Sequence, residues 1–560
     1  MKRLLLLLLV AVGMTRAAAQ QTDIPELEQP RLVVGLVVDQ MRWDYLTRYA
    51  DQYCEGGFRR LMREGWNCNR TFINYLPAIT AVGHTSVYTG TVPALSGIIG
   101  NSFFKDGKVV YCTADPSVEA LGALDKKGKP DAKAKAGLES PRNMLVRTMT
   151  DQLRLATNFR SKVIGVALKD RAAILPAGHA ANAAYWMDGN SYNFISSTYY
   201  MKELPQWVRD FNARELGKSY EKQFLAYKNK KIKDGPWPLL LEREAYVQSA
   251  APGQSWENTL DETIKQSPWG QTITFDMAQA AVEGEALGQN PAGVPDFLAV
   301  SISSTDMIGH RVSPNSIWME DCYLRLDRDV ARFLSFLDEK VGKGKYLVFL
   351  TADHAGAHNV EFRREHHLPG STFPENRIAA DLKSALAARF PKLEKVVDRI
   401  LNMQVHFTPE ALHSPDYPQI LRATCDHLAK LPSVSYAFPL TAIPDYLPEP
   451  IRTKTINGYC PQRSGQVQII FQAGVTEDYA SKEETDRPDH IYKGTTHGVW
   501  SPDDTHIPLI FSGWKVPHGW DNRPHRIVDI AATICALLNI TEPDACVGRA
   551  VDFSQKQADF

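Results

Sequence analysis

RLVVGLVVD, at residues 31–39, is a short apolar run that ends in a carboxylate. A continuous apolar run of this length is typical of a strand that is buried on both faces of a parallel sheet. The same form recurs as SKVIGVALKD at residues 161–170, PDFLAVSISSTD at 295–306, KYLVFLTADH at 345–354 and HIPLIFSG at 506–513. The sequence therefore predicts a sheet built from these runs.

Helical patterns lie between the predicted strands. In residues 315–341, apolar side chains recur at spacings of three and four, and residues 526–538 form a second pattern of this kind. Strands that alternate with helices predict an α/β fold with a doubly wound, mostly parallel central sheet. Such sheets bind ligands at the carboxyl ends of their strands. Four of the five apolar runs end in Asp, or in Asp followed by His.

Two stretches interrupt this alternation. Residues 184–260 are rich in Tyr, Trp, Lys and turn signals, and residues 355–492 are mixed in character and contain several prolines. We expect both to be insertions that form a cap over the strand ends, although plain surface elaborations are the alternative. The catalytic core is then expected to consist of residues 30–183, 261–354 and 493–560.

The first residues have the pattern of a secretory signal peptide. Basic Lys2 and Arg3 precede a short apolar run, and small residues at 17–19 supply a cleavage site near Ala19. A membrane anchor would need about 20 apolar residues, and this run is far shorter. Residues 1–19 are therefore predicted to be removed on export to the periplasm or the medium, with no membrane partner.

Charge and cysteine content narrow the class of protein. The 63 basic residues nearly balance the 64 acidic ones, which gives no indication of a nucleic-acid partner. Eight cysteines fit an oxidising location. Cys54 with Cys68, and Cys535 with Cys546, are close enough in sequence to pair, but the connectivity stays open. Because the chain has no C-x-x-C pair, a cysteine zinc site is not expected.

Six acidic and imidazole side chains follow or adjoin the predicted strands. Singly, each of them would be interpreted as a turn former, a helix cap or a structural histidine. As a set, three carboxylates and three imidazoles at one sheet edge make two sites of three ligands each, and such donors suit zinc with an open position for substrate. Other divalent ions could take the same ligands. The six residues are Asp39, Asp306, His310, Asp353, His354 and His497.

Thr80 lies in the run NYLPAITAVGHTSVYTG, at residues 74–90. Pro77 prevents a helix before it, and residues 81–89 can form one after it, so Thr80 is expected at a helix N-terminus. Alone it would be an N-cap threonine. Beside metal ions, the proton affinity of its hydroxyl would fall, and the helix N-terminus would favour an incoming phosphate. Thr80 is therefore our predicted nucleophile.

Two cations and one amide are candidates for binding an anion. Lys169 and Arg171 stand at positions i and i+2 after a predicted strand, and an extended segment would present both on one side. Arginine can bind two oxygens of one anion. Asn101, 21 residues after Thr80, could donate an amide hydrogen bond. Without the other residues, these three would be interpreted as a solvated charge cluster and a turn residue.

The order and context of these ten residues resemble the alkaline phosphatase superfamily, and most closely its phosphate-irrepressible (PafA-type) bacterial members, over residues 32–540. The resemblance implies that Asp306, His310 and His497 hold one zinc ion. It implies that Asp39, Asp353 and His354 hold a second, with the Thr80 hydroxyl as an added ligand. Asn101, Lys169 and Arg171 would then bind the phosphate oxygens.

The resemblance implies a secreted phosphomonoesterase that forms a covalent phosphothreonine and acts on small phosphate monoesters. The nearest alternative is a phosphodiesterase or nucleotide pyrophosphatase, which binds a second ester group in place of the paired cations. A sulfatase is disfavoured because Cys460, Pro461 and Arg463 have the wrong spacing for its motif. A non-catalytic binding protein is disfavoured because the residue set is complete. The natural substrate, a further magnesium and the oligomeric state stay open, with a monomer favoured.

Overall fold

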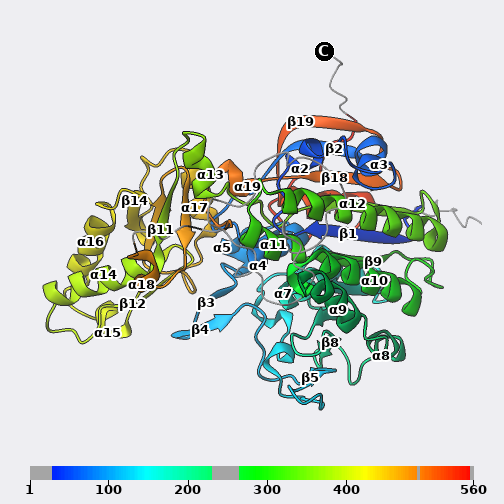
Figure 1. The fold of residues 1–560 in the computed structure, drawn as a ribbon, viewed down its shortest axis with the longest axis horizontal. Coiled ribbons are helices and arrows are strands. Elements are labelled where there is room, and N and C mark those ends of the chain that lie inside the picture. Colours follow the sequence, from blue (N-terminus) through cyan, green and yellow to red (C-terminus); the bar gives the residue numbers. More distant parts are fainter. Residues whose placement is uncertain (1–27, 230–263, 488–491, 493, 555–560) are drawn as a thin grey trace, which may run out of the picture.

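A computed structural model of the chain describes residues 28–229, 264–487, 492 and 494–554 (Figure 1). The predicted signal peptide and residues 230–260 of the first predicted insertion lie outside this range. Among the helices that are described, none combines the length and the apolar character needed to cross a membrane.

The apolar runs form strands of one sheet, which has eleven strands in the described chain. At its centre, β1 (Leu32–Val38) pairs in parallel with β9 (Asp296–Ile302) and β10 (Tyr346–Thr351). The parallel set continues from β9 to β6 (Val163–Ala167) and β7 (Ala183–Met187). All five strands are buried along their whole length, as their mostly apolar sequences predict.

Antiparallel strands extend the sheet at both edges. Beyond β10 it continues with β18 (Leu509–Gly513) and β2 (Trp66–Phe72). Strand β2 also pairs antiparallel with β17 (His506–Ile507) and in parallel with β19 (Gly519–Arg526). Beyond β7 lie β8 (Phe194–Ser197) and β5 (Ala120–Leu121). The predicted insertion at 184–260 therefore begins, in the structure, with two strands of the sheet. Its first aromatic residues, Tyr185 and Trp186, are core residues.

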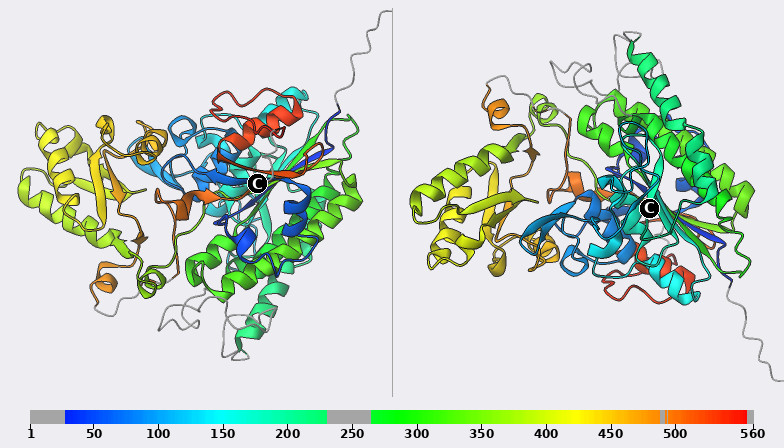
Figure 2. Two further views of the ribbon diagram at one scale, coloured as in Figure 1. Left: turned by 90° about the horizontal axis from the view of Figure 1, so that it is seen from above. Right: turned by 90° about the horizontal axis from the view of Figure 1, so that it is seen from below.

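Helices cover both faces of the sheet, so the predicted doubly wound α/β fold is confirmed (Figure 2). On one face, α10 (Pro268–Gly284) packs on β9 and on α12 (Ile317–Leu337), the helix predicted within residues 315–341. On the other face, α7 (Asp170–Ala177) packs on β6 and on α4 (Thr80–Thr89). Helices α6 (Met149–Ala156) and α20 (Asp529–Leu538) complete that layer.

Residues 371–478, which we call the accessory lobe, have a sheet and a core of their own. The four strands are antiparallel, in the order β12 (Val397–Leu401), β13 (Gln404–Phe407), β15 (Val467–Phe471) and β14 (Val434–Pro439). Helices α14 (Glu375–Arg389) and α16 (Tyr417–Leu428) pack on them. The lobe lies beside the main sheet, at the left of Figure 1.

Shorter elements connect these parts. They are α2 (Tyr45–Arg48), α3 (Phe58–Glu64), α5 (Pro93–Ser96), α8 (Gln206–Ala213), α9 (Leu216–Asn229), α11 (Ser304–Val312), α13 (Val360–Glu365), α15 (Pro409–Leu412), α17 (Ile451–Gly458), α18 (Lys482–Thr485), α19 (Pro502–Thr505), β3 (Ser102–Lys105), β4 (Lys108–Tyr111), β11 (Ser371–Pro374) and β16 (Val475–Asp478). All eight cysteines lie in the described residues, and each is a free thiol, so neither of the pairings considered from the sequence is formed.

Candidate metal centre and active site

The carboxyl ends of neighbouring parallel strands bring the candidate residues to one edge of the sheet. Asp39 follows β1, Asp353 follows β10 and Lys169 follows β6. Asp306 lies in α11, the helix that begins directly after β9. Because these four strands are adjacent, their ends form a single site, as expected of a doubly wound sheet.

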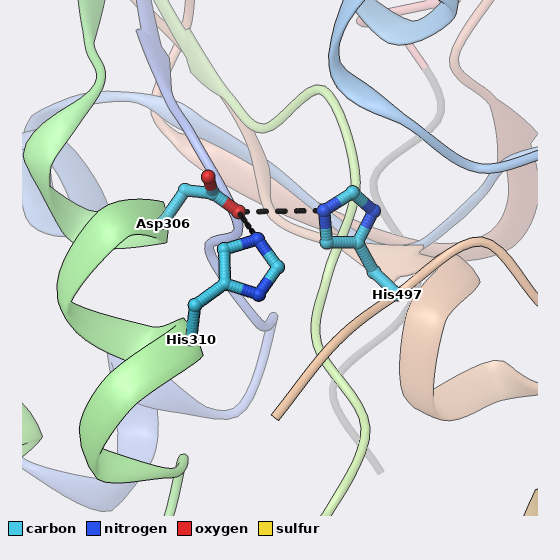
Figure 3. Close-up of side chains that lie close together, drawn as sticks. All are labelled: Asp306, His310 and His497. Carbon is cyan, nitrogen blue, oxygen red and sulfur yellow. Dashed lines mark ion pairs between the residues drawn. The ribbon is translucent and has the colours of Figure 1, made fainter. Parts of the chain in front are cut away.

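The first ligand group consists of Asp306, His310 and His497 (Figure 3). Asp306 and His310 lie one turn apart on α11, and His497 reaches them from the loop before α19. The Nε2 atoms of His310 and His497 lie 3.1 and 3.4 Å from Asp306 Oδ1. Their Nδ1 atoms lie 2.8 and 2.9 Å from backbone carbonyl oxygens. Since a carbonyl only accepts, each Nδ1 carries a proton, and each Nε2 is the nitrogen that a metal ion would coordinate when the imidazole is neutral.

The second ligand group consists of Asp39, Asp353 and His354. The His354 Nε2 atom lies 3.4 Å from Asp39 Oδ1 and 3.4 Å from Asp353 Oδ2. Its Nδ1 atom lies 2.9 Å from the carbonyl oxygen of Ala355, which again leaves the Nε2 lone pair directed at the carboxylates.

Both groups fit a divalent metal ion. In each, the three candidate ligand atoms lie within 4.8 Å of one another. Asp39 Oδ1 is buried and accepts no hydrogen bond from the described residues. A buried carboxylate oxygen without a donor is costly, and a coordinated cation would remove that cost. Tight clusters of carboxylate oxygen and imidazole nitrogen are donor sets for zinc and similar ions.

The electrostatics of the second group favour the same interpretation. Burial lowers the pKa of His354 to about 3, which keeps the imidazole in the neutral form that binds metals. Burial raises the pKa of Asp39, and repulsion by Asp306 and Asp353 raises it further. Closely spaced buried carboxylates of this kind need positive charge near them.

Thr80 is the first residue of α4, as the position of Pro77 predicted. Its side chain is buried, and its Oγ1 atom lies 3.4 Å from His354 Nε2. The hydroxyl therefore stands beside the second ligand group and at a helix N-terminus, where the helix dipole favours a bound anion.

Lys169 links the two ligand groups. Its Nζ atom lies 2.6 Å from Asp39 Oδ2 and 2.6 Å from Asp306 Oδ2. These carboxylates raise the pKa of the ammonium group against the effect of burial, so the positive charge is held at the centre of the site. Two of the three donors of the ammonium are used in this way, and one is left for a further acceptor.

Arg171 follows Lys169 by two residues, and Asn101 contacts the start of α4. The prediction that residues 169–171 are extended was wrong beyond Lys169, because Arg171 lies in the first turn of α7. The helix-forming residues that follow Arg171 extend the helix back to Asp170. Asn101 Oδ1 accepts a hydrogen bond of 3.0 Å from the backbone N–H of Ala81, which leaves the amide donors of Asn101 available.

Two residues that sequence reasoning missed support the ligands. Gln40 donates from Nε2 to Asp306 Oδ1 at 2.7 Å and from its backbone N–H to Asp353 Oδ1 at 3.2 Å. His84 Nδ1 lies 3.2 Å from Asp353 Oδ2. The signals were present, since Gln40 directly follows Asp39 and His84 lies one helical turn after Thr80.

Comparison with known proteins places the chain in a family. The model of the type I phosphodiesterase / nucleotide pyrophosphatase family matches residues 33–500. A Myroides odoratus protein named calcium-transporting ATPase is 43% identical over 95% of this chain and 96% of its own length. Alkaline phosphatase PafA of Elizabethkingia meningoseptica is 41% identical over 98% of each chain, and alkaline phosphatase PhoV of Synechococcus elongatus is 42% identical over 96% of this chain and 95% of PhoV.

The fold leads to the same relatives. The crystal structure of wild-type PafA superimposes with a TM-score of 0.82 at 41% sequence identity, covering 94% of this chain and 99% of PafA. The chain therefore belongs to the type I phosphodiesterase / nucleotide pyrophosphatase family of the alkaline phosphatase superfamily, next to its PafA-type members.

Proposed function

We propose that this protein is an exported, zinc-dependent alkaline phosphatase that hydrolyses small phosphate monoesters through a covalent phosphothreonine at Thr80. One observation carries the proposal. The Thr80 hydroxyl lies at a helix N-terminus beside the second of two three-ligand groups, and the Lys169 ammonium lies between the two groups. The names of two relatives that match nearly the full chain, PafA and PhoV, support a phosphatase.

The two groups hold two zinc ions in this proposal, one at Asp306, His310 and His497 and one at Asp39, Asp353 and His354. Bound zinc supplies Lewis-acid stabilisation of the entering and leaving oxygens and lowers the pKa of a nearby hydroxyl. The three Nε2 atoms that face the carboxylates and the unpaired Asp39 oxygen support this assignment.

The residues of the chain provide the nucleophile and the anion-binding donors. Thr80 Oγ1 gives its proton to solvent and attacks phosphorus, and the ester oxygen leaves with its bonding electrons and takes up a proton to become the alcohol. Water then attacks the phosphothreonine and the bond from phosphorus to Thr80 Oγ1 breaks. One proton of the water passes to Oγ1, which regenerates the hydroxyl, and inorganic phosphate is released. Asn101, Lys169 and Arg171 donate to the non-bridging oxygens, because a loose phosphoryl transition state depends mainly on positioning and electrostatic stabilisation.

A phosphodiesterase is the second candidate, and the description of the matching family favours it. The distinguishing feature is the pair of cations. A monoester dianion carries about one more negative charge than a diester, so Lys169 and Arg171 at one site favour the monoester.

Steady-state hydrolysis of p-nitrophenyl phosphate beside bis-p-nitrophenyl phosphate tests this proposal. With zinc-loaded protein we expect a higher kcat/KM for the monoester, and loss of that activity in Thr80→Ala. A preference for the diester would assign the chain to the phosphodiesterases. Activity that persists in the variant would exclude Thr80 as the nucleophile, and inactivity on both substrates would contradict the proposal.

Export is a separate part of the proposal and rests on residues 1–19. The mature protein is expected to begin at Gln20, which mass spectrometry of the exported protein would detect. Recovery of an intact N-terminus outside the cytoplasm would contradict the predicted cleavage.

A further inference from the structure

The hydroxyl group of Tyr111 lies between Arg171 and Asp170. It accepts a hydrogen bond of 2.9 Å from Arg171 Nη1 and donates one of 2.6 Å to Asp170 Oδ1. The direction of the two bonds is fixed, because a tyrosine hydroxyl has one proton, guanidinium only donates and carboxylate only accepts. Tyr111 ends strand β4, and Asp170 and Arg171 begin helix α7, so the contact joins two separate elements.

This arrangement orients Arg171 without neutralising it. Its Nη1 atom is 4.0 Å from Asp170 Oδ1, too far for a hydrogen bond, and the Tyr111 oxygen stands in place of a direct bidentate pair. Within the described part of the chain, the buried Arg171 Nε–H has no acceptor. A buried donor without a partner is rare in folded proteins, so this one is available to an anion.

The same strand connects Tyr111 to Asn101. In the β3–β4 hairpin, Tyr111 pairs with Ser102, which directly follows Asn101. The N–H of Cys112, the residue after Tyr111, donates to the carbonyl oxygen of Asn101 at 2.9 Å. One hairpin therefore fixes both the backbone of Asn101 and the hydroxyl that contacts Arg171.

We propose that Tyr111 is a positioning residue, whose hydroxyl fixes the Arg171 guanidinium in the orientation that binds the phosphoryl group. This inference rests on the proposed function, since it concerns the same site. Because Tyr111 acts through Arg171, its hydroxyl should affect turnover and phosphate binding only while Arg171 is present.

A double-mutant cycle tests this dependence. Wild-type protein, Tyr111→Phe, Arg171→Ala and the double variant are compared, all zinc-loaded and with thermal unfolding measured to verify the fold. The readouts are kcat/KM for p-nitrophenyl phosphate and the Kd of inorganic phosphate from calorimetry. Tyr220→Phe is the matched control, because its hydroxyl also bonds a carboxylate, Asp276 Oδ2 at 2.8 Å, but between α9 and α10.

We expect Tyr111→Phe to lower kcat/KM and weaken phosphate binding by about tenfold, the usual scale for a hydrogen bond to a charged group. In the Arg171→Ala background, the same change should alter either quantity less than twofold. An equal loss in both backgrounds, or no loss in either, would overturn the inference. If the wild-type protein lacks monoesterase activity, the proposed function fails, and the phosphate affinities of the four proteins alone decide the role of Tyr111.

Discussion

Gln40 connects the two ligand groups through its side-chain and backbone donors. The residue has a φ of +64°, in the left-handed region that few side chains adopt without strain. Gly309 and Gly356 leave room for its side chain, since a Cβ at Gly309 would lie 2.0 Å from Gln40 Oε1. Such outer contacts orient metal ligands and affect how tightly the ion is held.

We therefore predict that Gln40→Asn weakens zinc retention by about tenfold or more. Asparagine tolerates the left-handed conformation, but its amide is one methylene shorter and cannot reach Asp306. Competition with a chromophoric chelator measures the change, and Gln472→Ala in the accessory lobe is the control. Unchanged zinc affinity in Gln40→Asn would show that the contact with Asp306 does not support the metal site.

Lys454 gives a pH-dependent prediction that is independent of the metal ligands. Its ammonium group is buried and donates to the carbonyl oxygen of Trp500 at 2.9 Å and to Thr505 Oγ1 at 3.0 Å. Burial lowers the pKa of Lys454 to about 7. Between that value and the ordinary lysine pKa of about 10.5, the unfolded state binds more protons than the folded state, so stability rises with pH across this window.

In Lys454→Met, the increase in the free energy of unfolding across this pH window should be smaller by on the order of a few kcal/mol, because methionine does not titrate. The free energy of unfolding from urea titrations at pH 7, 8.5 and 10 measures it. Lys126→Met, at an exposed position, serves as the control. If the pH dependence of Lys454→Met equals that of the wild type, the buried lysine is not the cause.

The sequence allowed the ligands to be proposed because they follow recognisable strands. Asp39 and Asp353 end apolar runs, and adjacent parallel strands bring such residues together. The position of Gln40 next to Asp39 was a signal that it lies near the site. Its contact with Asp306, and that of Lys169 with Asp39, depend on side-chain reach and backbone conformation, which the sequence pattern does not specify.

Among the elements, helix α4 is buried along its whole length. The sequence predicted a helix after Pro77, but not a buried one, because its small and polar residues show little amphipathic pattern. At Gly83, helix α4 lies close to Asp353, just after the end of β10. A Cβ added at Gly83 would lie 2.1 Å from the backbone oxygen of Asp353.

Gly83→Ala should therefore push α4, and with it Thr80, away from the ligands that follow β10. We expect kcat/KM to fall by about 100-fold and the free energy of unfolding to fall by about 1–3 kcal/mol, the usual cost of overpacking. Gly189→Ala is the matched control, since its nearest new neighbour would be Lys265 Nζ at 3.9 Å. Wild-type kinetics in Gly83→Ala would mean that the distance between α4 and Asp353 does not control the nucleophile.

Two element-level predictions failed for physical reasons. Lys169 is extended, but Arg171 is helical because Ala172, Ala173 and the residues after them form a helix. The strands β7 and β8 were assigned to an insertion because their aromatic residues lie among turn signals. Burial of those side chains in the sheet is a tertiary property, which composition does not reveal.

At the scale of the whole molecule, the accessory lobe contacts the β3–β4 hairpin. Asn402 Nδ2 donates to the carbonyl oxygen of Ser102 at 2.9 Å, and the rings of Phe104 and His406 stack with centroids 4.3 Å apart. The sequence indicated an insertion at residues 355–492, because the alternation of strands and helices stops in that stretch. It could not indicate this contact, which joins residues 300 positions apart.

Substitution of Asn402 tests whether the accessory lobe supports the active site. Asn402 and Met403 have φ values of +56° and +58° and connect β12 to β13 in a two-residue turn, so glycine fits the backbone at position 402. Asn402→Gly removes only the side chain that holds Ser102, the neighbour of Asn101. We expect kcat/KM for p-nitrophenyl phosphate to fall about three- to tenfold, with the thermal unfolding midpoint little changed.

The loss should disappear in an Asn101→Ala background, because the lobe would then have no Asn101 amide to hold in place. Asn376→Ala is the control, since this asparagine donates to the carbonyl oxygens of Tyr479 and Ala480, which directly follow the lobe in the chain. A loss that persists without the Asn101 amide would mean that the lobe affects turnover by another route, such as access of the leaving group. Unchanged kcat/KM in Asn402→Gly would show that the lobe does not affect the site through Asn402.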